Sequence, residues 1–174
     1  DEAEEVKKLI DKVLREVEEV VRRVNKRDKD LLREVEKVVR DVNREDKRVL
    51  EEVERSGVSE EVVKELRKLS KETHDESRRL LKELKELSEK THKESRDLLR
   101  TAEEIVRRLK KVLDDGGPVE EIVREIEKVA EDIMRRNEEL VKESEDVVRK
   151  IVRDNERLAE DSKRVVEEAV RREK

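Results

Sequence analysis

Residues 15–32 read REVEEVVRRVNKRDKDLL, and residues 33–50 repeat this stretch as REVEKVVRDVNREDKRVL. Eighteen residues make about five turns of α-helix, so each copy returns to the same helix face about 27 Å further along. The repeated positions include Val and Leu at three- and four-residue spacing, whereas most of the differences fall at charged positions. This pattern predicts one long amphipathic helix with a repeated buried face.

The same internal 18-residue repeat occurs twice more in the chain. Residues 64–81 read KELRKLSKETHDESRRLL, and residues 82–99 read KELKELSEKTHKESRDLL, with one charged residue exchanged for another at every difference. In the last third of the chain, Asn137 and Ser144 recur as Asn155 and Ser162. The sequence therefore preserves the positions expected inside and varies those expected outside.

Two short breaks separate the three repetitive segments. Gly57 fits the left-handed position after a helix C-terminus, and Ser59 is placed to cap the next helix. At the second break, Gly116 can close a helix and Pro118 suits the first turn of the following one. The helices are predicted at about residues 2–55, 59–114 and 118–172.

The composition excludes most alternatives to an all-α fold. Asp, Glu, Lys and Arg make up 56% of the chain, and aromatic residues and Cys are absent. Disordered chains with such charge lack the periodic apolar residues seen here. The predicted architecture is an antiparallel up-down-up bundle of three long, nearly straight helices, forming a single domain over 1–174. The short connections force antiparallel neighbours, and an 18-residue period differs from the heptad that supercoils a coiled coil.

The charges argue against several classes of partner. The 51 acidic and 46 basic residues are finely mixed, which is typical of a solvated surface rather than a nucleic-acid interface. No apolar stretch is long enough to span a membrane, and the acidic start does not resemble a signal peptide. We expect a soluble chain, cytoplasmic if expressed in a host, with no nucleic-acid, membrane, small-molecule or cofactor partner.

Polar residues interrupt the apolar stripes at matching heights. When the chain is folded at its two breaks, these residues collect into two layers with apolar layers around them. The first layer is predicted to contain Asn25, Asp28, Ser88, Thr91, His92, Ser95, Asn137 and Ser144. The second is predicted to contain Asn43, Asp46, Ser70, Thr73, His74, Ser77, Asn155 and Ser162.

Such layers have a physical cost that suggests their role. A buried polar group without a partner costs about 1–3 kcal/mol, so each layer is expected to form a mutually satisfied hydrogen-bond network. A helix that slid along its neighbours would leave buried donors unpaired. The layers are therefore expected to specify helix register and pairing rather than to add stability.

These features together resemble computationally designed (de novo) helical bundles with modular buried hydrogen-bond networks. The resemblance rests on the duplicated network segments, the aromatic-free Leu, Val and Ile core, the Glu, Lys and Arg surface and the idealised breaks. It implies a structural scaffold or assembly building block without catalytic activity. Some members of that class contain buried His residues that act as pH-triggered switches.

The residues of the layers invite three sharper interpretations. Each layer contains Ser, His and Asp, but straight helices offer no oxyanion hole, so no catalytic residues are expected. Each layer has one His and one Asp and no H-x-x-x-H pair, so no metal site is expected. A pH-responsive bundle stays possible, although contact between His92 and Asp28 would favour acid resistance instead.

The oligomeric state is open at the level of sequence. The apolar stripe on each predicted helix suits a closed three-helix bundle, for which a monomer is expected. A stripe of this width also suits a four-helix arrangement. In that alternative the chain is the larger half of a designed heteromer, or a homo-oligomer, that accepts a further helix.

Overall fold

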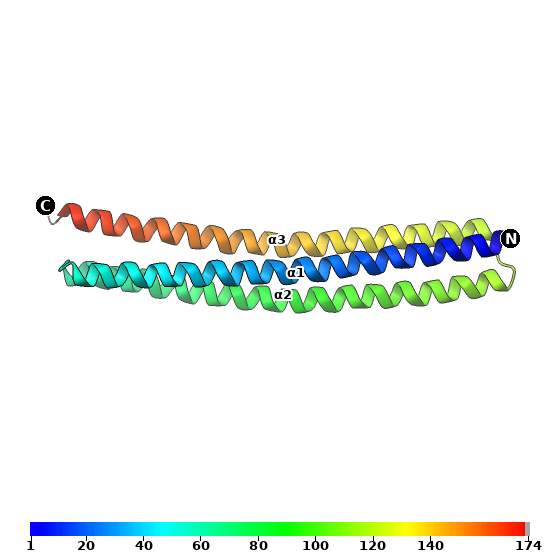
Figure 1. Ribbon diagram of the computed structural model, residues 1–174, viewed down its shortest axis with the longest axis horizontal. Coiled ribbons are helices and arrows are strands. Elements are labelled where there is room, and N and C mark those ends of the chain that lie inside the picture. The colour runs from blue at the N-terminus through cyan, green and yellow to red at the C-terminus, as the bar shows by residue number, and fades with distance from the viewer. Residues whose placement is uncertain (173–174) are drawn as a thin grey trace. The chain divides into compact units, whose positions relative to one another are not determined.

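The computed structural model describes residues 1–172, apart from the side chains of residues 169 and 170. Three helices account for nearly all of them: α1 (Glu2–Arg55), α2 (Glu60–Asp114) and α3 (Val119–Arg172) (Figure 1). The prediction of an all-α, three-helix bundle is confirmed, and the predicted ends agree to within one residue. Contacts group the chain into two compact units, residues 1–29 with 87–144 and residues 30–86 with 145–174, of which 173–174 lie outside the described residues.

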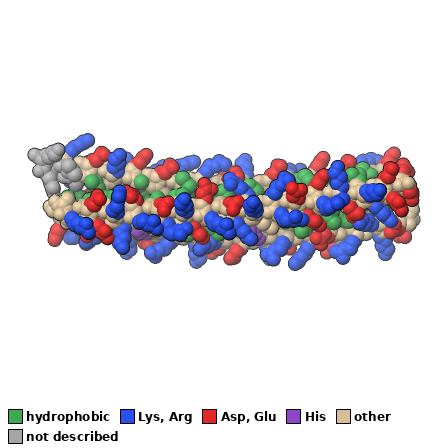
Figure 2. Space-filling model, in the orientation of Figure 1, with side chains coloured by type: hydrophobic (Ala, Val, Ile, Leu, Met, Phe, Trp, Pro, Cys, Tyr) green, Lys and Arg blue, Asp and Glu red, His purple; other side chains and the backbone are tan. Residues whose placement is uncertain are grey.

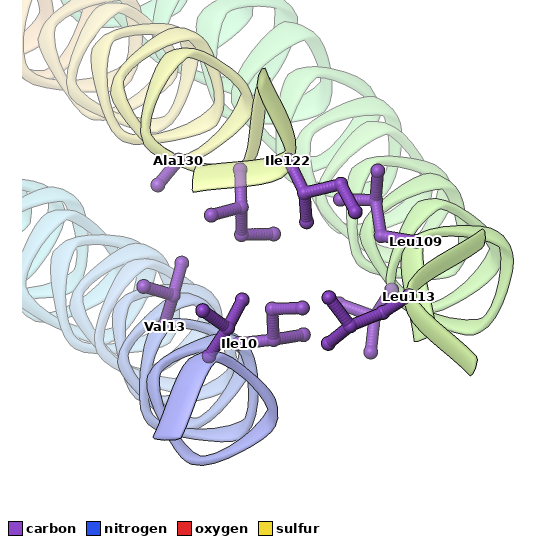
Figure 3. Packing of buried hydrophobic residues seen from close by; sticks show 9 residues of the cluster. Ile10, Val13, Leu109, Leu113, Ile122 and Ala130 are labelled. Atoms are coloured by element: carbon purple, nitrogen blue, oxygen red, sulfur yellow. The ribbon is translucent and has the colours of Figure 1, made fainter. Parts of the chain in front are cut away.

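Unit 1 is built around an apolar cluster to which all three helices contribute. Ile10 of α1, Leu109 of α2 and Ile122 of α3 are each at most 3% exposed. Figure 3 shows their side chains converging, with those of Val13 and Leu113, on the space between the helices. A second cluster joins Val17, Ala102 and Ile133 further along the same helices. Numbers rise along α1 and fall along α2 from one cluster to the next, as antiparallel packing requires.

Unit 2 repeats this arrangement with the other halves of the helices. Its larger cluster joins Val35 of α1, Leu80 and Leu84 of α2, and Ile151 of α3, all at most 1% exposed. Its smaller cluster, around Val53, Val62 and Leu66, lies beside the break between α1 and α2. Val is β-branched and has a modest intrinsic helix propensity. Helices rich in Val therefore depend on the burial of their amphipathic faces for stability.

The two breaks have the backbone that the sequence predicts. Gly57 and Gly116 adopt positive φ angles of 76° and 83°, in the left-handed region that an L-residue avoids. Ser59 directly precedes α2, but the bond made there joins the Val62 N–H to the backbone carbonyl of Ser59. Val58 packs against the small cluster of unit 2, as expected for a hydrophobic staple.

Charged side chains of both signs alternate over the visible surface (Figure 2). Ion pairs join neighbouring helices as well as successive turns: Lys110 and Asp11 lie 2.5 Å apart, and Arg67 and Glu54 lie 2.6 Å apart. The part of the chain that the structure describes contains no helix long and apolar enough to cross a membrane.

Candidate functional site

All sixteen predicted layer residues lie on the inner side of the helices. Each set of eight falls within one unit, the first in unit 1 and the second in unit 2. The half-buried members are Asn25, Asn43, Asp46, Ser70, Thr73, His74 and His92. The buried members, each at most 7% exposed, are Asp28, Ser77, Ser88, Thr91, Ser95, Asn137, Ser144, Asn155 and Ser162.

The contact between α2 and α3 has the same geometry in both layers. In unit 1, Ser95 Oγ donates to Asn137 Oδ1 at 3.2 Å, and Asn137 Nδ2 donates to the Ile133 carbonyl at 2.8 Å. In unit 2, Ser77 Oγ donates to Asn155 Oδ1 at 3.2 Å, and Asn155 Nδ2 donates to a carbonyl four residues earlier at 2.8 Å. Each amide is therefore fixed by its own helix and receives a hydroxyl from the neighbouring helix.

The contact between α1 and α2 pairs an imidazole with a carboxylate. His92 Nε2 lies 3.7 Å from Asp28 Oδ2 in unit 1, and His74 Nε2 lies 3.5 Å from Asp46 Oδ2 in unit 2. These distances exceed the usual range of about 2.7–3.2 Å for an N–H···O hydrogen bond. With a protonated imidazole, each pair is an ion pair at the edge of the layer.

Side chains of α1 and α3 are joined less closely. In unit 2, Ser162 Oγ donates to Asp46 Oδ1 at the limiting distance of 3.5 Å. In unit 1, the equivalent hydroxyl of Ser144 is buried without a hydrogen-bond partner among the described residues. The polar contacts of each layer are thus concentrated on α2.

The expectation of fully satisfied layers is wrong. Thr73 Oγ1 bonds the Leu69 carbonyl of its own helix at 2.9 Å, whereas the equivalent Thr91 hydroxyl is unpaired. The reason is geometric, because side chains fixed on straight helices cannot all reach one another. Eight buried atoms lack a hydrogen-bond partner within residues 1–172: Asn25 Oδ1, Asp28 Oδ2, Asn43 Oδ1, Asp46 Oδ2, His74 Nε2, Thr91 Oγ1, His92 Nε2 and Ser144 Oγ.

The histidines are less buried than the sequence suggests. The side chains of His74 and His92 are 28% and 25% exposed, and imidazole atoms are visible at the surface in Figure 2. Their Nε2 atoms are buried. The carboxylate of Asp28, by contrast, is 3% exposed. Each imidazole therefore covers the carboxylate from the solvent side of the layer.

One element that the sequence analysis missed lies beside the first layer. Arg136 donates from Nε to Glu94 at 2.6 Å and from Nη1 to Glu139 at 3.1 Å. The pKa of Arg136 is raised, chiefly by the hydrogen bond to Glu94. This pair joins α2 to α3 next to Ser95 and Asn137. The residue eighteen positions after Arg136 is Asp154, so the arginine is not repeated in unit 2. A comparison of the charges in the two repeats could have pointed to this arginine.

Unit 2 also contains a groove between α1 and α3. Its volume is about 400 Å³, and it is lined by apolar side chains that include Val42, Val49 and Leu158. Two residues of the wall are smaller than their counterparts in the preceding repeat: Ala159 replaces Val141, and Val49 replaces Leu31. Asp46 and Ser162 of the second layer lie in the same wall.

Comparison with known proteins gives no family model, curated protein or solved structure that matches the chain. Functional inference therefore depends on the layers and the groove themselves. In the described part of the chain, no group of three or more His, Cys, Asp or Glu side chains is placed to hold a metal ion.

Proposed function

We propose that this chain is a de novo designed structural scaffold, an assembly building block without catalytic activity, in which two polar layers specify helix register and pairing. The observation that carries the proposal is the duplicated contact between α2 and α3. Ser95 with Asn137 and Ser77 with Asn155 share a hydrogen-bond length of 3.2 Å. The two contacts come from repeats whose surface charges differ, so the buried positions are the preserved ones.

The specificity follows from burial. Asn137 is 0% exposed, so its Oδ1 finds a donor only where a hydroxyl of α2 stands at the right height. A slip of one helical turn that brings Leu98 and Leu99 of α2 opposite this amide removes the bond. Leaving a buried polar group unpaired costs about 1–3 kcal/mol, and the second layer adds a similar cost. Apolar contacts alone discriminate less between registers, because a slipped helix brings one Val or Leu to the place of another.

The hydroxyl partners support a structural role over a hydrolytic one. A nucleophilic Ser donates to the imidazole that activates it. Here Ser95 donates to Asn137, and Ser77 donates to Asn155. The Ser hydroxyl, which would be the nucleophile of a triad, and the His imidazole, which would be its base, therefore contact different residues.

Chemical crosslinking tests the proposed role in register. The chain lacks Cys, so two can be introduced at will. Glu94→Cys with Arg136→Cys reports the observed register, because these side chains meet across α2 and α3. Leu98→Cys with Arg136→Cys reports the slip of one turn that brings Leu99 opposite Asn137. In a chain whose layer residues are unchanged, a short bis-maleimide is expected to join the first cysteine pair and not the second.

The matched comparison replaces the amide contacts. In a chain carrying Ser77→Ala, Ser95→Ala, Asn137→Leu and Asn155→Leu, both cysteine pairs are expected to crosslink. Circular dichroism should show unchanged helicity in this chain. If it crosslinks only the first pair, the apolar core and the breaks set the register, and the proposed role of the layers is wrong.

A second candidate function is supported by the groove of unit 2. We infer that it accepts one amphipathic helix from another polypeptide, with apolar residues along one face and basic residues beside Glu45 and Glu52, which line the α1 wall. Light scattering of the isolated chain tests this. A stable monomer near 20.8 kDa that ignores such a peptide contradicts the candidate. Peptide binding that is lost in Ala159→Leu, which fills the groove, supports it.

A further inference from the structure

The same three atoms make no hydrogen bond within the described residues in either polar layer. In unit 1 they are Asn25 Oδ1, Asp28 Oδ2 and His92 Nε2, and each is buried. In unit 2 they are the corresponding atoms of Asn43, Asp46 and His74. The two sets occupy equivalent positions of the 18-residue repeat. In both, Nε2 and Oδ2 face each other at the distance of an ion pair without forming a hydrogen bond.

Each set consists of atoms that can coordinate a metal ion. A neutral imidazole offers a lone pair at Nε2 while Nδ1 keeps its proton, and carboxylate and amide oxygens are also ligands. Asn and Asp are three residues apart on α1, so their side chains lie on one face of the helix. The His approaches from α2. The carboxylate of Asp28, at 3% exposed, supplies a buried negative charge.

The separations of these two atoms are longer than a hydrogen bond and close to those of two ligands of one ion. Ligand atoms about 2.0–2.2 Å from a zinc ion lie about 3.3–3.6 Å apart at a tetrahedral angle. Nε2 and Oδ2 are 3.5 Å apart for His74 and Asp46, within this range, and 3.7 Å apart for His92 and Asp28, slightly beyond it. Both distances are longer than the about 2.7–3.2 Å of an N–H···O bond.

We propose that each layer binds one divalent transition-metal ion, with zinc as the representative case. The ligands are His92 Nε2, Asp28 Oδ2 and Asn25 Oδ1 in unit 1, and their counterparts from His74, Asp46 and Asn43 in unit 2. Water completes the coordination. The ion joins α1 to α2, the two helices that the Ser–Asn contacts do not connect. This inference goes beyond the proposed scaffold role and does not depend on it.

The donor set determines the class of ion and the strength expected. One imidazole and two oxygens match zinc and cobalt, whereas calcium and magnesium prefer oxygen ligands alone. Each site has one His ligand and one Asp ligand, and its third ligand is a neutral amide. Binding is therefore expected to be weaker than at structural zinc sites with four Cys or His ligands. The partly exposed imidazole gives an ion access to the site by rotating outward.

Cobalt titration of the full chain tests the proposal directly. Metal-free protein near neutral pH is titrated with Co²⁺ in excess Mg²⁺, which occupies the acidic surface. Visible absorption of nitrogen-coordinated Co²⁺ is expected to saturate at two ions per chain. His92→Asn and His74→Asn should each leave one ion, and the double variant should leave none. Zn²⁺ should displace the signal and raise the unfolding temperature of the original chain.

Two further variants keep the test decisive. Asp28→Asn with Asp46→Asn preserves the size of both side chains and should also abolish the signal. Asp30→Asn with Asp97→Asn, which changes exposed carboxylates instead, should leave two ions bound. Circular dichroism confirms that each variant is helical. Absence of the signal from the original chain, or its persistence in the double His variant, overturns the proposal.

Discussion

Ser95 Oγ donates to Asn137 Oδ1 at 3.2 Å, and both residues are 0% exposed. The amide is held from the other side, because its Nδ2 donates to the Ile133 carbonyl of its own helix at 2.8 Å. A hydroxyl of α2 thus meets an amide of α3 whose orientation is already fixed. The pair restricts how α2 and α3 can align in unit 1, whatever its net contribution to stability.

Replacing this pair by apolar residues should not unfold the chain. In Ser95→Ala with Asn137→Leu, no buried donor or acceptor of the pair is left unpaired, so the stability should be unchanged or higher. Asn137→Leu alone should cost about 1–3 kcal/mol relative to the double variant, because the Ser95 hydroxyl loses its acceptor. Denaturant unfolding measures both. A large loss of stability in the double variant would show that the layer supports the fold itself.

The two members of the imidazole–carboxylate pair should respond differently to removal. His92→Leu leaves the Asp28 carboxylate buried without its ion-pair partner and should cost about 1–3 kcal/mol or more. Asp28→Leu leaves an imidazole that can still reach solvent, and should be nearly neutral or stabilising. The same comparison at His74 and Asp46 should give smaller effects, since the Asp46 side chain is 10% exposed and accepts from Ser162. Equal costs for the two replacements of the first pair would contradict this account.

A surface pair in unit 2 allows a direct titration. The pKa of Glu76 lies below its ordinary value of 4.5, chiefly because Arg79 donates a side-chain hydrogen bond to the carboxylate. A lowered pKa means that this contribution to stability is present above the ordinary value and is lost as the pH falls through the folded-state pKa. NMR titration should show the pKa of Glu76 returning toward 4.5 in Arg79→Gln. Because both side chains are about half exposed, unfolding at neutral pH should hardly change.

Helix boundaries and layer positions were predictable because both depend on spacing. Gly57 and Gly116 have the positive φ angles that their positions after a helix predict. The 18-residue repeat places Asn137 and Asn155 on the buried face, and both are at most 1% exposed. Periodicity fixes the direction of a side chain from the helix axis, which is sufficient for these results.

The hydrogen bonds within the layers could not be predicted in the same way. Thr91 and Thr73 occupy equivalent positions, yet only Thr73 bonds a carbonyl of its own helix. Such differences depend on rotamers and on shifts of a few tenths of an ångström between helices. The groove of unit 2 arises similarly, because Ala159 leaves space whose size depends on how closely α1 and α3 approach there.

The position of each polar layer inside its own unit has a consequence for how the chain can be altered. Every layer takes its donors and acceptors from one eighteen-residue stretch of each helix, with apolar clusters of the same unit beside it. The stretches are therefore interchangeable parts. If the second-layer stretch of each helix is replaced by a copy of its first-layer stretch, the chain should contain two identical polar layers. If one further copy of the stretch is inserted into each helix, the chain should contain a third polar layer.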